Sequence, residues 1–370
     1  MPNLMLLFAG LWLAVSSPHP RARDLGVPFD GTPGPLNAIT DVAGVEIGET
    51  TLIRSDGPLS VRTGVTAILP RGKASRDMVM AGWFPLNGNG ELTGTAWLDD
   101  SGFLNGPIML TNTHSVGTVR DAVIAWRTRQ KSPDAEDYWW SLPVVGETDD
   151  SFLNDMNGFH VKAPDVFHAI ETAAPGPVAE GSVGGGTGTV CFEFKGGIGT
   201  ASRRVKAGGG SYTVGVLLQC NCGLRPQLTI AGVPVGREIP ESPAYEHEAG
   251  SILVVLATDA PLLPQQLKRL ARRGAMGLAR TGSISGNGSG DLFIAFTTAN
   301  VADRSSGAPL TAKYLPNGEL DPLFAAAAQA TEEAVVNALV AADTMKGQGG
   351  HVAIGLDHDK LKAALAKYRR

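Results

Sequence analysis

The sequence predicts an α/β protein in which strands and helices pack in layers. Short runs rich in β-branched and apolar residues alternate with turns made of Gly, Pro, Asn and Asp, which is the pattern of strands. Two longer segments, residues 117–129 and 264–278, carry apolar residues at helical spacing with charges between them. With 43% apolar and 18% charged residues, the chain has the composition of a packed globular protein.

The order of the expected strands and helices supports a layered α/β arrangement. Short strands are expected at residues 44–48, 63–69 and 78–82, and the segment 107–115 follows them. The helix expected over 117–129 comes next, and strands followed by a helix indicate an α/β arrangement. Further strands are expected in the second half of the chain, and its last part is predicted to be helical. These elements are residues 143–147, 212–219, 250–257 and 289–296 for strands, and 264–278, 320–345 and 360–368 for helices.

The N-terminus resembles an export signal. Residues 4–15 form an apolar block too short to span a bilayer, and residues 14–16 offer a small-residue cleavage site. The block lacks a preceding Lys or Arg, so a packed N-terminal extension or a wrong start is the alternative. We therefore expect residues 1–16 to be removed and the protein to be periplasmic or secreted, or otherwise cytoplasmic.

Charge and cysteine content exclude several classes of protein. A net charge of -5 argues against nucleic acid as a partner, and the one basic helix, residues 264–278, is interpreted as a solvated face. Three cysteines do not make a disulfide framework. Cys220 and Cys222 are too close in sequence to bridge usefully, so buried thiols are expected.

No cofactor site stands out. The seven histidines are scattered without a metal-binding spacing, and His114 is interpreted as structural. The glycines of residues 181–189 lack the Lys-Ser or Lys-Thr of a phosphate-binding loop and are not followed by a convincing helix. Tight turns with close backbone approach explain them better than nucleotide binding does.

The rest of the chain is organised around Ser251. It follows Gly250 at the point where an acidic, aperiodic segment, residues 241–249, meets the apolar strand 250–257. Its hydroxyl could attack the carbonyl of Gly250, and hydrolysis of the resulting ester would free Ser251 as a new N-terminus. A glycine before the serine is expected because it tolerates the strained backbone that such an attack needs. The exposed α-amine, with a pKa of about 8, would then serve as the base for the hydroxyl beside it. The alternative is an ordinary serine at a strand entry, since Gly-Ser pairs recur in this chain.

Five further positions are candidates for the same chemistry. Asn221, at a strand end, could donate its amide to an oxyanion or satisfy a turn. Ser289 and Asp291 share a face if their segment is extended, and could orient a terminal amine or form a polar turn. Glu147, with Asp149 close behind, follows a short strand and could hold a cation or an ammonium group, or lie in a solvated turn.

Several motifs in the same order resemble the L-aminopeptidase/D-esterase (DmpA) family, which includes the β-peptidyl aminopeptidases. The resemblance covers nearly the whole chain from Arg21. Its most specific part is the Gly-Ser junction with its apolar tail, and the others are residues 87–91, 111–117, 184–188 and 279–282.

The resemblance implies a four-layer α/β/β/α sandwich like that of the N-terminal nucleophile hydrolases, formed by a single domain over residues 17–370. It implies self-cleavage into residues 17–250 and 251–370, with Ser251 as nucleophile and Asn221 as oxyanion donor. Ser289 and Asp291 would assist the nucleophile, and Glu147 would hold the substrate's amino group. The family needs no metal or other cofactor and is typically a homo-oligomer, often of four cleaved chain pairs.

One position departs from the family pattern. Asp149 stands where the aminopeptidase branch has a tyrosine, which leaves the preference between α- and β-amino substrates open. A second carboxylate beside Glu147 could strengthen ammonium binding and suit a displaced β-amino group. The function expected is a self-processing serine aminopeptidase or amidase acting on short peptides, amides or esters. The alternatives are acyl transfer of the ornithine acetyltransferase type, whose nucleophile is threonine, and a secreted binding protein without the chemistry.

Overall fold

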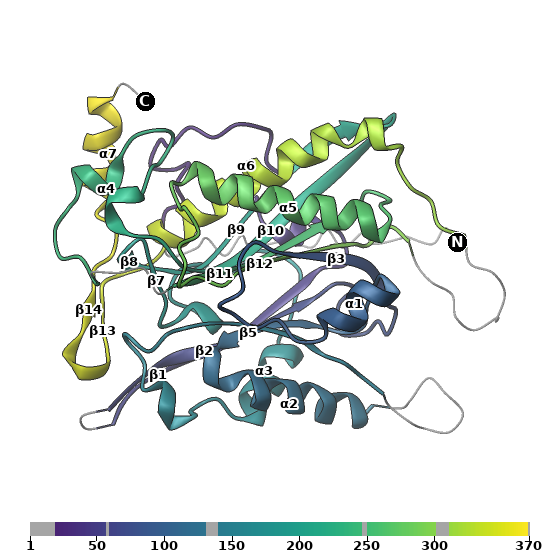
Figure 1. Ribbon diagram of the computed structural model, residues 1–370, viewed down its shortest axis with the longest axis horizontal. Helices are drawn as coiled ribbons and strands as arrows, with labels where there is room; N and C mark the ends of the chain where they lie inside the picture. The colour runs from purple at the N-terminus through teal and green to yellow at the C-terminus, as the bar shows by residue number, and fades with distance from the viewer. Residues whose placement is uncertain (1–18, 57–58, 131–139, 246–249, 301–310, 369–370) are drawn as a thin grey trace, which may run out of the picture.

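The computed structural model describes residues 19–56, 59–130, 140–245, 250–300 and 311–368. Two sheets lie face to face in the middle, with helices over each outer side (Figure 1). The predicted α/β/β/α sandwich is therefore confirmed. The predicted export segment, residues 1–16, lies outside the described residues.

The larger sheet has six strands in the order β4-β3-β12-β11-β10-β9. Neighbours are antiparallel except β11 and β12, which run parallel. A parallel pair needs a crossover connection, and helix α5 (Pro264–Arg280) supplies it. The strands span Phe103–Leu104 (β4), Val79–Pro85 (β3), Asp291–Thr297 (β12), Ser251–Thr258 (β11), Gly210–Asn221 (β10) and Gly197–Ala207 (β9).

The smaller sheet has four strands in the order β1-β2-β5-β6, of which β5 and β6 are parallel. Helix α2 (Val116–Thr128) follows β5 and makes the crossover. The strands span Glu46–Asp56 (β1), Leu59–Leu69 (β2), Ile108–Asn112 (β5) and Val144–Thr148 (β6).

Three apolar cores separate the four layers. One lies between the larger sheet and helices α5 and α6 (Asp321–Val340), and another between the smaller sheet and helices α2 and α3 (Ala163–Glu171). The third fills the space between the sheets. Alternate residues of β11 enter different cores, Val254 the helix side and Leu253 the inter-sheet side. A strand buried on both faces carries a continuous apolar run, which is why this strand was readable from the sequence.

Shorter elements complete the chain. They are α1 (Thr95–Ser101), α4 (Val235–Glu238), α7 (His358–Lys367), β7 (Val190–Cys191), β8 (Phe194–Lys195), β13 (Met345–Lys346) and β14 (Val352–Ala353). Among the described residues, no helix combines the length and the hydropathy that a membrane span requires.

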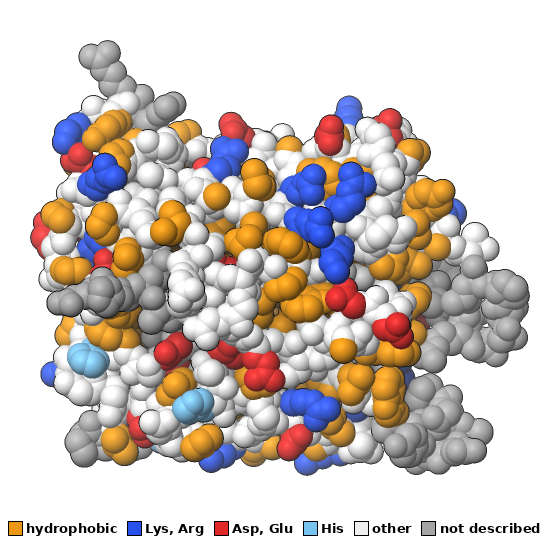
Figure 2. Space-filling view, in the orientation of Figure 1, with side chains coloured by type: hydrophobic (Ala, Val, Ile, Leu, Met, Phe, Trp, Pro, Cys, Tyr) orange, Lys and Arg blue, Asp and Glu red, His pale blue; other side chains and the backbone are white. Residues whose placement is uncertain are grey.

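The basic helix packs as predicted. Leu267, Leu270 and Ala271 are buried, and Figure 2 shows Lys and Arg side chains gathered over the outer face of α5. Lys268 pairs with Asp99 at 3.0 Å, and Arg273 lies 4.0 Å above the ring of Phe324. These cations therefore have partners within the protein, in keeping with a solvated face.

The cysteines correct one prediction. All three are buried, but Cys191 and Cys220 form a disulfide, and Cys222 remains a thiol. The hairpin β7–β8 places Cys191 against the end of β10, a contact between segments 29 residues apart in the sequence. The three sulfur atoms lie within 4.8 Å of one another.

Breaking this bridge is expected to destabilise the fold. Cys191→Ser should lower the free energy of unfolding by about 3–4 kcal/mol, because the disulfide restricts the unfolded chain. Cys222→Ser is the matched control, since it removes a buried sulfur and leaves the bridge. Urea unfolding of both variants measures the difference. Equal losses in the two variants would contradict the disulfide, as would three reactive thiols in denatured, unreduced protein.

Candidate active site

Ser251 lies at the centre of the larger sheet. It is the first residue of β11, between β10 and β12, and is 5% exposed. It shares a strand face with Leu253, which belongs to the inter-sheet core. The hydroxyl therefore lies on the side of the sheet that faces the second sheet.

Gly250 is required for a reason other than the one expected. Sequence reasoning invoked its tolerance of a strained backbone, but its φ does not fall in the left-handed region. A Cβ at this position would instead lie 1.8 Å from the backbone oxygen of Asn221. Only glycine lets the chain pass so close to the end of β10.

Ser289 and Asp291 come together as the extended pattern predicted. The Ser289 hydroxyl donates to Asp291 Oδ1 at 2.5 Å, and the same oxygen accepts the N–H of Ile252 at 3.2 Å. Asp291 Oδ2 is buried without a partner at hydrogen-bond distance. Burial raises the pKa of this carboxyl, and the hydroxyls of Ser285 and Ser289 oppose the rise. Between the two residues, the N–H of Gly290 donates to Ser251 Oγ at 3.1 Å. Asp291 thus accepts a hydrogen bond from the backbone of Ile252, next to the nucleophile. The Ser251 hydroxyl itself accepts a hydrogen bond from the N–H of Gly290.

Asn221 is the register partner of Ser251 across β10 and β11. Its Oδ1 accepts the N–H of Val190 at 2.8 Å. This bond fixes which end of the amide faces the hairpin β7–β8, so Nδ2 is left to donate elsewhere. The geometry matches a donor placed beside a reacting carbonyl.

Glu147 is anchored at the end of β6. Its side chain is 4% exposed and accepts the hydroxyl of Thr113 and, at 2.9 Å, the N–H of Glu91. Burial raises the pKa of Glu147, the two hydrogen bonds oppose the rise, and the charge of Asp149 adds to it. A buried carboxylate with so few partners suits a positively charged group.

Two glycines, Gly90 and Gly290, connect Glu147 to the nucleophile. A Cβ on Gly90 would lie 3.4 Å from Glu147 Oε1 and 3.1 Å from the Cα of Gly290, and Gly290 bonds Ser251. The backbones of Gly90 and Gly290 therefore connect the carboxylate to the hydroxyl. A substrate whose amine meets Glu147 and whose carbonyl meets Ser251 would lie along these two glycines.

Asp149 lies at the edge of this site. It is half-buried, and its Oδ1 accepts the N–H of Ser151 at 2.7 Å. Its charge, together with burial as the larger cause, raises the pKa of Tyr245. A tyrosine thus lies near this carboxylate, although it comes from the segment before the Gly-Ser junction.

Three supporting residues were not singled out from the sequence. Asn87 accepts the N–H of Asp291 at 2.5 Å, Thr113 bonds Glu147, and Lys195 lies buried on the hairpin that holds Asn221. Asn87 and Thr113 act through contacts distant in the chain, so no local pattern shows their roles. His114, predicted to be structural, is exposed and stacks on Phe159 with ring centroids 5.8 Å apart.

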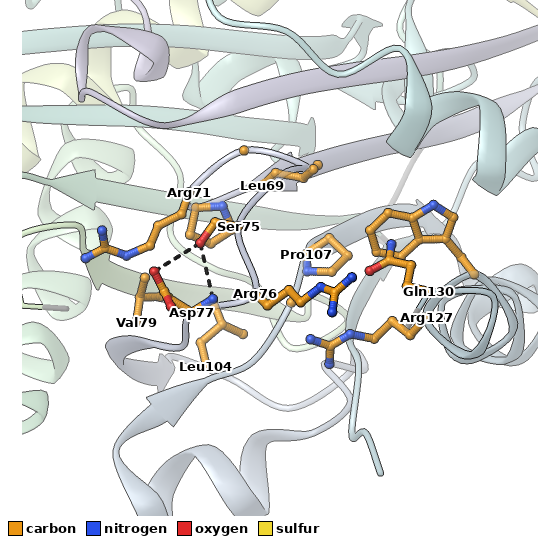
Figure 3. Close-up of a pocket in the computed structure, with 14 residues that line it drawn as sticks. Leu69, Arg71, Ser75, Arg76, Asp77, Val79, Leu104, Pro107, Arg127 and Gln130 are labelled. Atoms are coloured by element: carbon orange, nitrogen blue, oxygen red, sulfur yellow. Dashed lines mark hydrogen bonds between the residues drawn. The ribbon is translucent and has the colours of Figure 1, made fainter. Parts of the chain in front are cut away.

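A second pocket lies at the other end of the sheets (Figure 3). Arg71, Arg127 and Leu104 contribute to its lining, and Ser75 and Asp77 bond each other there. It adjoins the starts of β3 and β5, whereas Glu147 lies near the end of β6 and Asn87 follows the end of β3. The pocket is therefore separate from the site around Ser251.

The glycine segment 181–189 forms tight turns, as predicted. Gly184–Gly186 make one buried 3₁₀ turn, and a Cβ on Gly185 would lie 2.2 Å from Gln219 Oε1. The segment therefore packs against the strand that ends at Asn221. Close backbone approach explains its glycines.

Comparison with known proteins agrees with this geometry. The model of "Peptidase family S58" matches residues 37–353. A β-peptidyl aminopeptidase (BapA) of Sphingosinicella microcystinivorans is 55% identical, over 98% of this chain and 97% of that protein.

Two solved structures share the whole architecture. The L-aminopeptidase D-Ala-esterase/amidase of Ochrobactrum anthropi, described as a prototype of the serine aminopeptidases with a variant of the Ntn hydrolase fold, superimposes with a TM-score of 0.89. It is 47% identical and covers 95% of this chain and 99% of its own. A Burkholderia sp. β-aminopeptidase superimposes with a TM-score of 0.88 at 49% identity, over 94% and 98%. The chain therefore belongs to peptidase family S58 and is a serine aminopeptidase with the N-terminal nucleophile hydrolase fold.

Proposed function

We propose that this protein cuts itself between Gly250 and Ser251 and then uses Ser251 as an N-terminal nucleophile. The observation that carries the proposal is the placement of Ser251 between an amide donor and a buried acid, with Asn221 opposite it and Asp291 next to it. Attack of Oγ on the Gly250 carbonyl converts the peptide bond into an ester, and the proton moves to the departing nitrogen. Water then hydrolyses the ester, leaving a carboxylate on Gly250 and a free amine on Ser251.

Aminopeptidase turnover follows from the same groups. The free α-amine takes the proton of the Ser251 hydroxyl, which attacks the substrate carbonyl. Asn221 Nδ2 donates to the developing oxyanion. The buried, unpartnered Oδ2 of Asp291 is available to the α-ammonium that forms, and Ser289 orients this carboxylate. Water then releases the acyl group.

Glu147 explains why an amino terminus is needed. Its buried carboxylate binds the ammonium group of the substrate's first residue, and the backbones of Gly90 and Gly290 connect this carboxylate to Ser251. Short peptides and amino-acid amides or esters fit this arrangement.

We infer that β-amino acids are accepted at this position. The support is the 55% identity to a β-peptidyl aminopeptidase and the second carboxylate, Asp149, which could hold an amine displaced by one carbon. Asp149→Ala should lower kcat/KM for a β-aminoacyl p-nitroanilide by about 5-fold, because a half-exposed charge contributes about 1 kcal/mol, and change the α-aminoacyl value less. Asp149→Tyr should act in the same direction. Ser151→Ala, which keeps the backbone bond to Asp149, is the matched control. Unchanged kinetics in both Asp149 variants would count against this role.

Location and assembly are part of the proposal. A disulfide between Cys191 and Cys220 is typical of an oxidising compartment, which supports a periplasmic or secreted protein. A homo-oligomer of four cleaved chain pairs is the assembly that family membership favours.

Acyl transfer of the ornithine acetyltransferase type is the weaker alternative, because the nucleophile there is threonine and here it is serine. A binding protein of the same fold is disfavoured by the buried Asp291 beside Ser251, whose Oδ2 has no partner at hydrogen-bond distance. A denaturing gel of purified protein tests the proposal, since two fragments are expected and a binding protein would remain whole.

A further inference from the structure

Lys195 is a buried cation that the proposed chemistry does not use. It lies on β8, its side chain is 0% exposed, and its Nζ donates to three backbone oxygens. The acceptors are Gly196 at 2.7 Å, Thr189 at 3.0 Å and Gly186 at 3.3 Å. Three acceptors require three N–H groups, which only the ammonium form supplies. Burying a charged group costs free energy, so the location of this ammonium group needs an explanation.

The three acceptors belong to the segment that orients Asn221. Gly186 and Thr189 lie in the glycine turn, and Thr189 directly precedes Val190, whose N–H bonds Asn221 Oδ1 at 2.8 Å. The N–H of Gly196 also bonds the Thr189 carbonyl at 3.0 Å. Lys195 therefore ties both ends of the β7–β8 hairpin together, immediately behind the residue that holds the amide.

The hairpin has no room to move toward the strand. A Cβ on Gly196 would lie 2.5 Å from the backbone oxygen of Cys220, and one on Gly185 would lie 2.2 Å from Gln219 Oε1. The glycine turn and the hairpin thus pack tightly against the last residues of β10. With backbone on one side and the ammonium of Lys195 on the other, the position of the Val190 N–H is determined on both sides.

A buried carboxyl approaches this loop from the end of the smaller sheet. Asp150 is 1% exposed and follows β6, three residues after Glu147. Burial lowers the pKa of Lys195 to about 7 and raises the pKa of Asp150 to about 7, and the charge of Asp150 opposes the shift of the lysine. A Cβ on Gly188 would lie 3.1 Å from the Cβ of Asp150. The pair therefore spans the strand that bears Glu147 and the loop behind Asn221.

We propose that Lys195 is a positioning residue, which holds the Thr189–Val190 peptide so that Asn221 presents Nδ2 to the oxyanion. The inference rests on the oxyanion role proposed for Asn221. Removing the ammonium should leave substrate binding at Glu147 intact and misalign the oxyanion donor. Loss of one such donor costs about 10²- to 10³-fold in kcat, which sets the upper limit of the effect.

The test is a double-mutant cycle with Lys195→Met and Asn221→Ala, read as kcat and KM per cleaved chain. Lys195→Met should lower kcat by up to roughly 10²-fold with little change in KM. Added to Asn221→Ala, it should have no further effect, because both changes remove the same donor. A full additional loss in the double variant would overturn the proposal, as would an unchanged kcat in Lys195→Met alone. If Asn221→Ala keeps wild-type kcat, the oxyanion role of Asn221 fails. In that case a loss in Lys195→Met would assign the lysine another role.

A charge-balanced variant separates an effect on folding from an effect on catalysis. Lys195→Met removes a buried cation that the charge of Asp150 favours, so the variant Asp150→Asn/Lys195→Met, which carries neither charge, should recover the melting temperature. Its kcat should stay low if Lys195 positions the amide, and recovery of kcat together with stability would reduce Lys195 to a structural role. If a variant accumulates as uncut precursor, the rate of self-cleavage replaces kcat in the double-mutant cycle. The proposal again predicts that Lys195→Met has no further effect when Asn221→Ala is already present.

Discussion

Ser251→Ala is expected to remain a single uncut chain and to lose aminopeptidase activity by at least roughly 10⁴-fold, as other serine hydrolases do without their nucleophile. The variant has no hydroxyl to attack Gly250, so no free α-amine forms at residue 251. The same change removes both the nucleophile and its base, and the two losses are therefore inseparable. A denaturing gel and a p-nitroanilide assay measure them together.

Ser211→Ala is the matched control for this experiment. Ser211 also follows a glycine, but it is exposed on β10 and away from Asn221. This variant should be cleaved and active like the unmodified protein. A cut chain in Ser251→Ala would contradict the self-cleavage mechanism.

Glu147→Gln is expected to lower kcat/KM by roughly 10²- to 10³-fold, because the substrate ammonium loses a buried, hydrogen-bonded carboxylate. Self-cleavage should proceed normally, since the scissile carbonyl of Gly250 needs no ammonium site. Glu91→Gln is the control, because Glu91 contributes its backbone N–H to Glu147 and not its side chain. Failure of Glu147→Gln to mature, or normal kinetics once matured, would contradict the assignment.

The same carboxylate should make binding depend on pH. Burial raises the pKa of Glu147, so its protonated, neutral form appears at a higher pH than the usual value of about 4.3. The neutral form cannot pair with an ammonium group, and binding should weaken as the pH falls through the raised pKa. The inhibition constant of a released amino acid product, measured against pH, should show this loss in the unmodified protein and not in Glu147→Gln.

Elements with a strong local pattern were predictable from the sequence. The apolar run of β11 and the helical spacing in α5 gave both elements close to their observed bounds. Ser289 and Asp291 were paired by strand alternation alone, and their side chains do bond. Strand β9 was not predicted, because its glycines and the charged residues Arg203, Arg204 and Lys206 hide the alternation.

The contacts that complete the site could not be read in this way. The disulfide between Cys191 and Cys220 and the hydrogen bond from Asp291 to Asn87 each join segments that only the packed sheets bring together. The contacts of Lys195 are local, but they depend on a glycine turn whose path the sequence does not reveal. The need for Gly250 was foreseen, but its cause was not. The cause is the backbone of Asn221 on the neighbouring strand, which no local rule reveals.

N-terminal sequencing of the mature protein tests the account most directly. Two termini are expected, and one of them should read Ser-Ile-Leu-Val from residue 251, in a preparation that hydrolyses aminoacyl p-nitroanilides. An active preparation that yields only one terminus, from an intact polypeptide, would show that the hydroxyl and the amine of Ser251 do not act as one catalytic unit.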